Sequence, residues 1–223
     1  MIQWLWLLYL LQPLRRNKPI QRAPGGMVVV LNGFPGTVKH TIFKRLQELL
    51  PADKSSRLVD NHLLIDPVQA LFPDRSDDHH ALRRRIRDVV FPCIRKLAQE
   101  GHVVLMTACL ATETHRDAVC FREHLALVRG TDMPLYWVSA SCDRERLVER
   151  AQSDERVQSN KAKLTDPAIL EGLVNAHHLL EPGELSGGST NLVVGSLDTN
   201  GEVDDSARRL MEMVGLARAV GAE

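Results

Sequence analysis

Short apolar runs alternate along this chain with longer segments in which apolar residues recur at regular intervals. Runs that are apolar at nearly every position are typical of strands buried on both faces of a sheet. Segments with an apolar residue at about every third or fourth position are typical of amphipathic helices. The apolar runs predict five strands, at residues 27–31, 56–60, 102–107, 135–139 and 191–195.

The periodic segments between these runs predict the helices. The longest spans 81–99, where apolar residues form one stripe and arginines lie opposite, and Glu100-Gly101 ends it. A helix is also expected from Asp166-Pro167, because proline suits the first turn of a helix. Further helices are expected at 42–50, 66–72, 113–128, from 143 onward and at 203–214.

Strands that alternate with helices predict a parallel sheet with helices on both of its faces. We therefore expect an α/β fold, a three-layer sandwich with a mainly parallel five-stranded sheet and a small lid. Ligands of such sheets bind beyond the carboxyl ends of the strands. The segment that follows the first strand is therefore a candidate binding site.

That segment, residues 33–41, carries much of a phosphate-loop motif, G-x-x-x-x-G-K-[ST]. Gly33 and Lys39 fill the first and seventh positions, whereas Val38 replaces the second glycine and His40 replaces the hydroxyl residue. Thr41, one residue later, can supply a hydroxyl. Loop amides and the helix N-terminus bind phosphate, and the lysine adds a positive charge. The alternative is an ordinary connection between a strand and a helix, in which Pro-Gly makes a turn.

The loop resembles that of adenylate kinases, whose form is G-x-P-G-x-G-K-x-T, and Val38 is the one clear departure. From about Met27 to Gly215 the chain also resembles P-loop proteins of the small-molecule-kinase-like AAA class, through residues 33–37, 59–67 and 163–166. The resemblance implies a kinase-type core that binds ATP with Mg²⁺, with Thr41 near the metal. The expected nucleotide-binding residues are Gly33, Pro35, Gly36, Thr37, Val38, Lys39, His40 and Thr41.

Charged residues elsewhere suggest the remaining catalytic groups. Asp60 ends the second strand, where a carboxylate can accept a proton or hold Mg²⁺ through water; it could equally cap the turn that follows. Arg150 and Arg156 flank an expected hinge and could close over phosphates, or they could lie on a solvated helix face. The third strand ends in Thr107 and not in an acid, which argues against a motor ATPase.

The amino-acid composition limits the classes of molecule that we expect the protein to bind. Basic and acidic residues number 28 each, so no overall charge favours nucleic acid, and no nucleic-acid partner is expected. The four cysteines are scattered, as in a reduced cytoplasmic protein. The His79-His80 and His177-His178 pairs are poor chelates, because adjacent side chains diverge around a helix.

The first residues differ from the rest of the chain. Residues 1–26 form an apolar and then basic extension that we expect to be poorly ordered; a membrane-surface anchor is the alternative. The apolar part is too short to span a bilayer as a helix, so no stable membrane insertion is expected. Residues 27–219 are expected to form the kinase-like domain, with the lid near 150–165.

These features favour an ATP-dependent phosphotransferase that acts on a small hydroxyl compound, which the sequence does not identify. Lys39 would contact the outer phosphates, Asp60 would be the base, and Arg150 and Arg156 the closing clamp. The alternative is a nucleotide-binding regulatory module that has lost catalysis, because Val38 crowds the loop.

Overall fold

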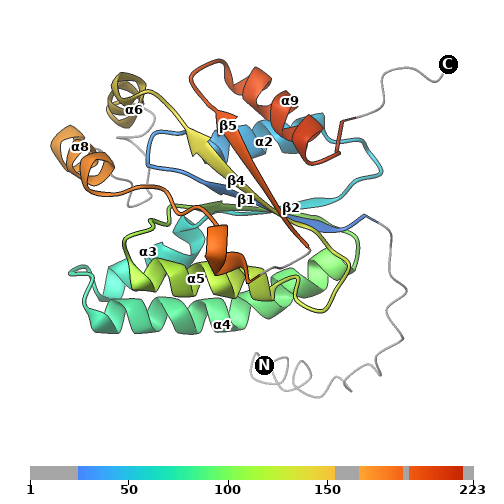
Figure 1. Cartoon of the computed structure of the whole chain (residues 1–223), viewed down its shortest axis with the longest axis horizontal. Helices are drawn as coiled ribbons and strands as arrows, with labels where there is room; N and C mark the ends of the chain where they lie inside the picture. The colour runs from blue at the N-terminus through green and yellow to red at the C-terminus, as the bar shows by residue number, and fades with distance from the viewer. Residues whose placement is uncertain (1–24, 154–165, 188–190, 218–223) are drawn as a thin grey trace, which may run out of the picture.

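The computed structural model describes residues 25–153, 166–187 and 191–217, and these form a three-layer α/β sandwich (Figure 1). The central sheet has five strands in the order β2-β3-β1-β4-β5, and every neighbouring pair is parallel. The expected fold class is therefore confirmed. The strands are β1 (Met27–Asn32), β2 (Ser56–Val59), β3 (Val103–Ala108), β4 (Leu135–Ser141) and β5 (Leu192–Asp198).

Helices cover both faces of this sheet (Figure 1). One face carries α2 (Lys39–Leu49) and α9 (Val203–Met213). The opposite face carries α3 (His62–Leu71), α4 (Asp77–Gln99) and α5 (His115–Ala126). Two helices, α6 (Arg144–Ala151) and α8 (Pro167–Ala176), pack together beyond the carboxyl ends of the strands, and a 3₁₀ turn spans Gly183–Ser186.

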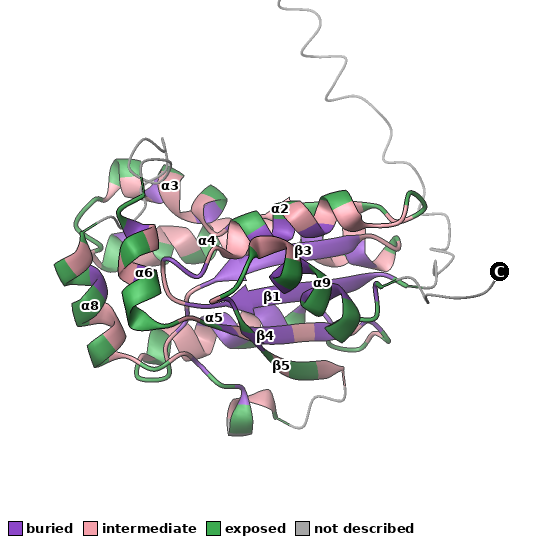
Figure 2. Ribbon diagram, turned by 90° about the horizontal axis from the view of Figure 1, so that it is seen from above, coloured by how far each residue is buried: buried purple, intermediate pink, exposed green. Residues whose placement is uncertain are grey.

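Strand β1 belongs to both hydrophobic cores. Val28 and Val30 face the core under α4 and α5, whereas Val29 and Leu31 face the core under α2 and α9. Successive side chains of a strand point to opposite faces, so an unbroken apolar run is what a strand between two helical layers requires. Figure 2 shows β1 and β3 buried at the centre of the sheet, and β5 exposed at its edge.

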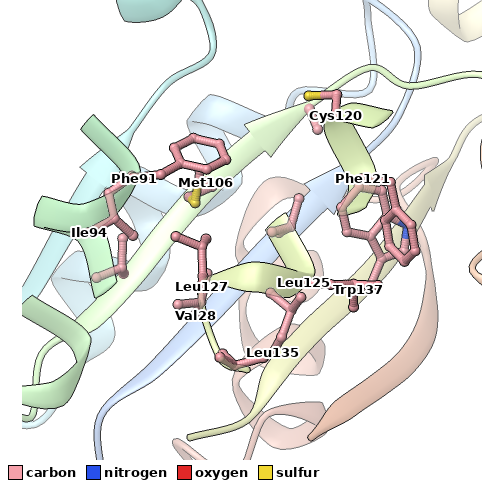
Figure 3. Packing of buried hydrophobic residues seen from close by; sticks show 14 of the residues in the cluster. Val28, Phe91, Ile94, Met106, Cys120, Phe121, Leu125, Leu127, Leu135 and Trp137 are labelled. Atoms are coloured by element: carbon pink, nitrogen blue, oxygen red, sulfur yellow. The ribbon is translucent and has the colours of Figure 1, made fainter. Parts of the chain in front are cut away.

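The core under α4 and α5 is centred on aromatic side chains (Figure 3). Phe121 meets Trp137 edge to face with ring centroids 4.8 Å apart, an arrangement that aromatic quadrupoles favour. The buried indole N–H of Trp137 donates to the Leu180 carbonyl at 3.3 Å. This contact fixes the segment after α8 against the sheet.

Two helices, α3 and α4, begin four residues earlier than predicted. The brief helix expected from Asp66-Pro67 begins at His62, so Pro67 lies inside α3. The long helix begins at Asp77 and not at Ala81, because the Ser76 hydroxyl caps it and Asp77 lies in the first turn. Residues 1–24 of the expected extension and 154–165 of the expected lid lie outside the described residues. No described helix has both the length and the apolarity needed to cross a membrane.

Candidate functional site

The loop at residues 33–38 joins β1 to α2 at the carboxyl edge of the sheet. A Cβ at Gly33 would lie 2.9 Å from the backbone oxygen of Ala140 in β4. Gly36 has a φ of 94°, and a Cβ there would lie 2.8 Å from the backbone oxygen of Leu147 in α6. Both positions therefore require glycine, because backbone atoms of two other elements press against the loop.

Lys39, the first residue of α2, turns its ammonium group back onto this loop. Its Nζ donates to the carbonyl oxygens of Gly33 at 2.6 Å and Phe34 at 3.0 Å, and to Thr37 Oγ1 at 3.1 Å. The buried Thr37 hydroxyl itself donates to the Phe34 oxygen at 2.7 Å, next to the turn at Pro35. A positive charge thus lies where loop amides and the N-terminus of α2 already favour an anion.

Val38 has the backbone conformation that the motif reserves for glycine. Its φ of 46° and ψ of 26° lie in the left-handed region, and it is the N-cap of α2. A β-branched residue there is strained, at a cost of roughly 1–3 kcal/mol. The side chain packs against the core under α2 and α9. Val38 therefore has a left-handed backbone conformation, which favours glycine, at the position where the motif has glycine.

Asp60 follows β2 and is 5% exposed. Thr107, in β3, donates its hydroxyl to Asp60 Oδ1 at 2.8 Å and accepts from the Asn61 amide at 2.8 Å. The other carboxylate oxygen, Oδ2, lies 3.4 Å from Nδ1 of His40 in the first turn of α2. The His62 amide also donates to Oδ1, at 3.4 Å, so the carboxylate both closes the turn and faces the phosphate loop.

Thr41 is exposed in the first turn of α2, one residue beyond His40. The described residues include no group of three or more His, Cys, Asp or Glu side chains that could hold a metal ion. A hard cation such as Mg²⁺ accepts phosphate oxygens and water as most of its ligands. The Thr41 hydroxyl and the Asp60 carboxylate supply oxygen donors that would suit a Mg²⁺ ion bound together with a nucleotide.

Arg150 lies in the last turn of α6. Its guanidinium donates to the carbonyl oxygens of Thr199 at 2.8 Å and Gly201 at 3.4 Å, and to Cys142 Sγ at 3.4 Å. These bonds tie α6 to the connection between β5 and α9. Arg156, its expected partner, lies outside the described residues.

Solved structures share this arrangement of sheet, loop and helices. An APS kinase from Mycobacterium tuberculosis, in complex with AMPPNP and APS, is 16% identical, with 86% of this chain and 99% of that chain covered, at a TM-score of 0.52. A Bacteroides thetaiotaomicron shikimate kinase is 16% identical over 85% and 99%, with a TM-score of 0.51. A sugar kinase from a Janibacter species is 16% identical over 90% and 100%, with a TM-score of 0.54.

The fold is that of the P-loop kinases. The resemblance seen in the sequence is thereby confirmed at the level of the fold. No protein-family model matches the chain, and neither does any curated protein sequence. In the P-loop kinase fold the nucleotide phosphates lie at the loop after β1, the place that residues 33–38 occupy here.

One residue that supports this site was missed from the sequence. Asn32 is fully buried at the end of β1; its Oδ1 accepts from the Leu110 amide at 2.7 Å, and its Nδ2 donates to the Leu110 oxygen at 3.1 Å. It thus holds the connection after β3 beside the phosphate loop. The signal for this role was a polar residue at the end of an apolar run, directly before Gly33.

The face assigned to the α4 arginines was also wrong in part. Arg83 and Arg87 are half-buried and line a hollow next to Thr107, whereas the sequence placed the arginines opposite the apolar stripe. Their spacing of four residues was the available signal, because it puts both on one face, beside Ile86 and Val90 of the stripe.

Proposed function

We propose that this protein is an ATP-dependent phosphotransferase that acts on a small hydroxyl compound. The single observation that carries the proposal is the position of the Asp60 carboxylate. It follows β2, is held by Thr107 and faces the first turn of α2. A proton acceptor and a loop suited to phosphate therefore meet at one edge of the sheet, as phosphoryl transfer requires.

In the proposed reaction the acceptor hydroxyl oxygen attacks the terminal phosphorus of ATP. The bond from that phosphorus to the bridging oxygen breaks and ADP leaves, while the hydroxyl proton passes to Asp60. Lys39 would turn from the loop oxygens to the outer phosphates, and bound Mg²⁺ would neutralise phosphate charge near Thr41. The fold of the solved P-loop kinases supports this assignment at the level of the nucleotide and a small-molecule acceptor.

Arg150 and Arg156 remain predicted clamp residues. Arg150 already donates hydrogen bonds to the connection at residues 199–201. It could therefore contact phosphates only after those hydrogen bonds break. We also propose a cytoplasmic location, which the four free thiols support: Cys93, Cys109, Cys120 and Cys142.

The decisive experiment is calorimetric titration of ATP with Mg²⁺ into the protein and into Lys39→Ala. We expect the variant to lose at least about tenfold in affinity, since each charge-assisted hydrogen bond contributes roughly 1.5–3 kcal/mol. Lys44→Ala is the matched control, because Lys44 is an exposed lysine on the same helix. Equal affinities for the protein and Lys39→Ala would rule the proposal out.

A second candidate is a nucleotide-binding module without catalysis, and the strained backbone of Val38 favours it. On that hypothesis Val38→Gly raises nucleotide affinity, yet neither form transfers phosphate to any acceptor. A screen of hydroxyl metabolites with ATP and Mg²⁺, with ADP release as the readout, separates the two functions. Acceptor-dependent ADP release by the unaltered protein would exclude the module.

A further inference from the structure

The first turn of α2 differs from the phosphate-loop motif at the residue after the lysine. The motif has Ser or Thr there, and the hydroxyl of that residue binds Mg²⁺. This chain has His40 instead, and strand β3 contains no acidic residue that could compensate. An imidazole therefore occupies the position from which the motif contacts the metal ion of the nucleotide.

The His40 ring faces a buried carboxylate that is itself held in place. Its Nδ1 atom is buried and lies 3.4 Å from Oδ2 of Asp60. The other oxygen of that carboxylate, Oδ1, accepts from the Thr107 hydroxyl at 2.8 Å and from the His62 amide at 3.4 Å. These two hydrogen bonds orient the carboxylate so that Oδ2 is the oxygen beside the ring.

This arrangement directs a ligand to the other ring nitrogen of His40. A carboxylate beside Nδ1 favours the tautomer with the proton on that atom, so the lone pair lies on Nε2. The side chain is 33% exposed although Nδ1 is buried, so solvent reaches the side chain at its other atoms. Histidines that bind metal ions usually have a carboxylate at their second nitrogen, because it fixes the ring and makes the ligand more basic.

A nitrogen ligand changes which ion a nucleotide-binding site prefers. Mg²⁺ is a hard ion that takes oxygen ligands. Divalent ions of the first transition row accept imidazole nitrogen as well as phosphate oxygens, and their affinity for such sites rises from Mn²⁺ onward. The described residues contain no group of three or more His, Cys, Asp or Glu side chains that could hold a metal ion. The remaining ligands would therefore be phosphate oxygens, water and the Thr41 hydroxyl.

We propose that His40 binds the divalent ion of the nucleotide through Nε2, and that the site therefore prefers a transition ion such as Mn²⁺ to Mg²⁺. Asp60 acts here as a positioning residue, through the ring that it orients. This inference rests on the proposed function and deepens it by naming the ion that the nucleotide-binding site selects. Mg²⁺ still supports nucleotide binding, but more weakly.

Calorimetric titration of AMPPNP measures this preference. AMPPNP is titrated into the protein in saturating Mn²⁺ and, separately, in saturating Mg²⁺ at the same pH. We expect the affinity with Mn²⁺ to be higher by about tenfold or more. His40→Ser, which restores the hydroxyl of the motif, should make the two affinities about equal. His115→Ser is the matched control, because His115 is an exposed histidine in the first turn of α5. An affinity ratio that is the same in the unaltered protein and in His40→Ser would overturn the proposal.

Electron spin echo spectroscopy identifies the ligand directly. In the complex with Mn²⁺ and AMPPNP, protein labelled with ¹⁵N-histidine should show a ¹⁵N nucleus bonded to the ion. The signal should be lost in His40→Ser and kept in His115→Ser. Because the unaltered protein is measured first, the result does not depend on the folding of a variant. A Mn²⁺ ion without a histidine nitrogen would contradict the proposal.

The positioning role of Asp60 is tested with Asp60→Asn, which keeps the shape of the side chain but removes its charge. We expect this variant to keep the ¹⁵N signal from His40 and to lose part of the preference for Mn²⁺. An unchanged preference would show that the carboxylate does not act through the ring.

A matched titration of Lys39→Ala separates this inference from the proposed function. If that variant and the unaltered protein bind nucleotide equally, the phosphotransferase assignment fails, whereas a histidine nitrogen on Mn²⁺ would keep the metal site. If nucleotide binding depends on Lys39 while His40→Ser leaves the affinity ratio unchanged, only the inference about the ion fails. No binding of AMPPNP with either ion would overturn both.

Discussion

At the scale of single residues, Val38 stands where the phosphate-loop motif has glycine, and its backbone has a left-handed conformation that favours glycine. The phosphate-loop pattern assigns glycine to this position, and the structure explains why, since φ is 46°. The sequence identified the substitution and predicted that the valine would crowd the phosphates and restrict the backbone angles, but it could not give the conformation that the backbone adopts. The backbone strain follows from the turn between Gly36 and Lys39. The geometry of that turn cannot be predicted from the type of any single residue.

Replacing Val38 with glycine should stabilise the protein. The strain of a β-branched residue in the left-handed region is roughly 1–3 kcal/mol, and the greater flexibility of glycine offsets about 1 kcal/mol of the gain. We therefore expect the free energy of unfolding to rise by about 1 kcal/mol, measured by urea denaturation. Val38→Ala keeps a Cβ at the same φ and should gain less. Equal gains would show that the backbone is not strained.

Buried His124 makes stability depend on pH. Its folded pKa of about 4 lies below the ordinary value of 6.5, mainly because burial disfavours the charged form. The folded state therefore favours the neutral ring; its contribution is complete above pH 6.5 and is lost as the pH falls toward 4. We expect unfolding to cost about 2 kcal/mol less at about pH 5 than at pH 7.5.

The matched variant for this effect is His124→Leu. Its side chain cannot titrate, and the lost contacts of His124 Nδ1 are with Cys120, one turn earlier in α5: its carbonyl oxygen at 2.8 Å and its Sγ at 3.9 Å. Urea denaturation of both proteins at the two pH values isolates the contribution of the imidazole. A pH dependence that is the same in both would contradict the assignment.

At the scale of elements, the apolar runs and periodic segments were sufficient to predict the sheet and the main helices. The strands β1 and β3 are buried throughout, and their sequences are apolar except near their carboxyl ends, where Asn32 and Thr107 lie. The sequence could not show which face of α4 lines the hollow next to Thr107, because long arginine side chains can line a buried cavity or reach solvent. Likewise, the sequence could not show that α6 contacts the connection at 199–201, because these two segments lie far apart along the chain.

That contact assigns Arg150 a structural role that can be measured. We expect Arg150→Ala to lower the free energy of unfolding by about 1 kcal/mol, because the carbonyls of Thr199 and Gly201 lose their donor. Arg146→Ala removes an exposed arginine of the same helix, which forms an ion pair with Glu149 three residues on, and should change little. Urea denaturation of the two variants compares them. If both were neutral, Arg150 would not be anchoring α6.

At the scale of the whole molecule, a bound nucleotide should stabilise the fold. Binding to the folded state alone adds about 2.7 kcal/mol when the free ligand is at roughly 100 times its Kd. For a protein of this size we expect ATP with Mg²⁺ to raise Tm by about 5–10 °C. Differential scanning calorimetry should show the shift, and Lys39→Ala should reduce it strongly. A shift of the same size in that variant would place the nucleotide elsewhere.

Because the side chains of β1 alternate between two cores, this strand has no tolerance for a change of length. Inserting or deleting one residue before Leu31 would turn each upstream valine toward the wrong helical layer. It would also displace Gly33 along the strand by about 3.3 Å relative to its neighbours. Natural variants and designed chimeras of this chain should therefore tolerate exchanges among apolar residues at positions 27–31, but no change in the number of residues in β1.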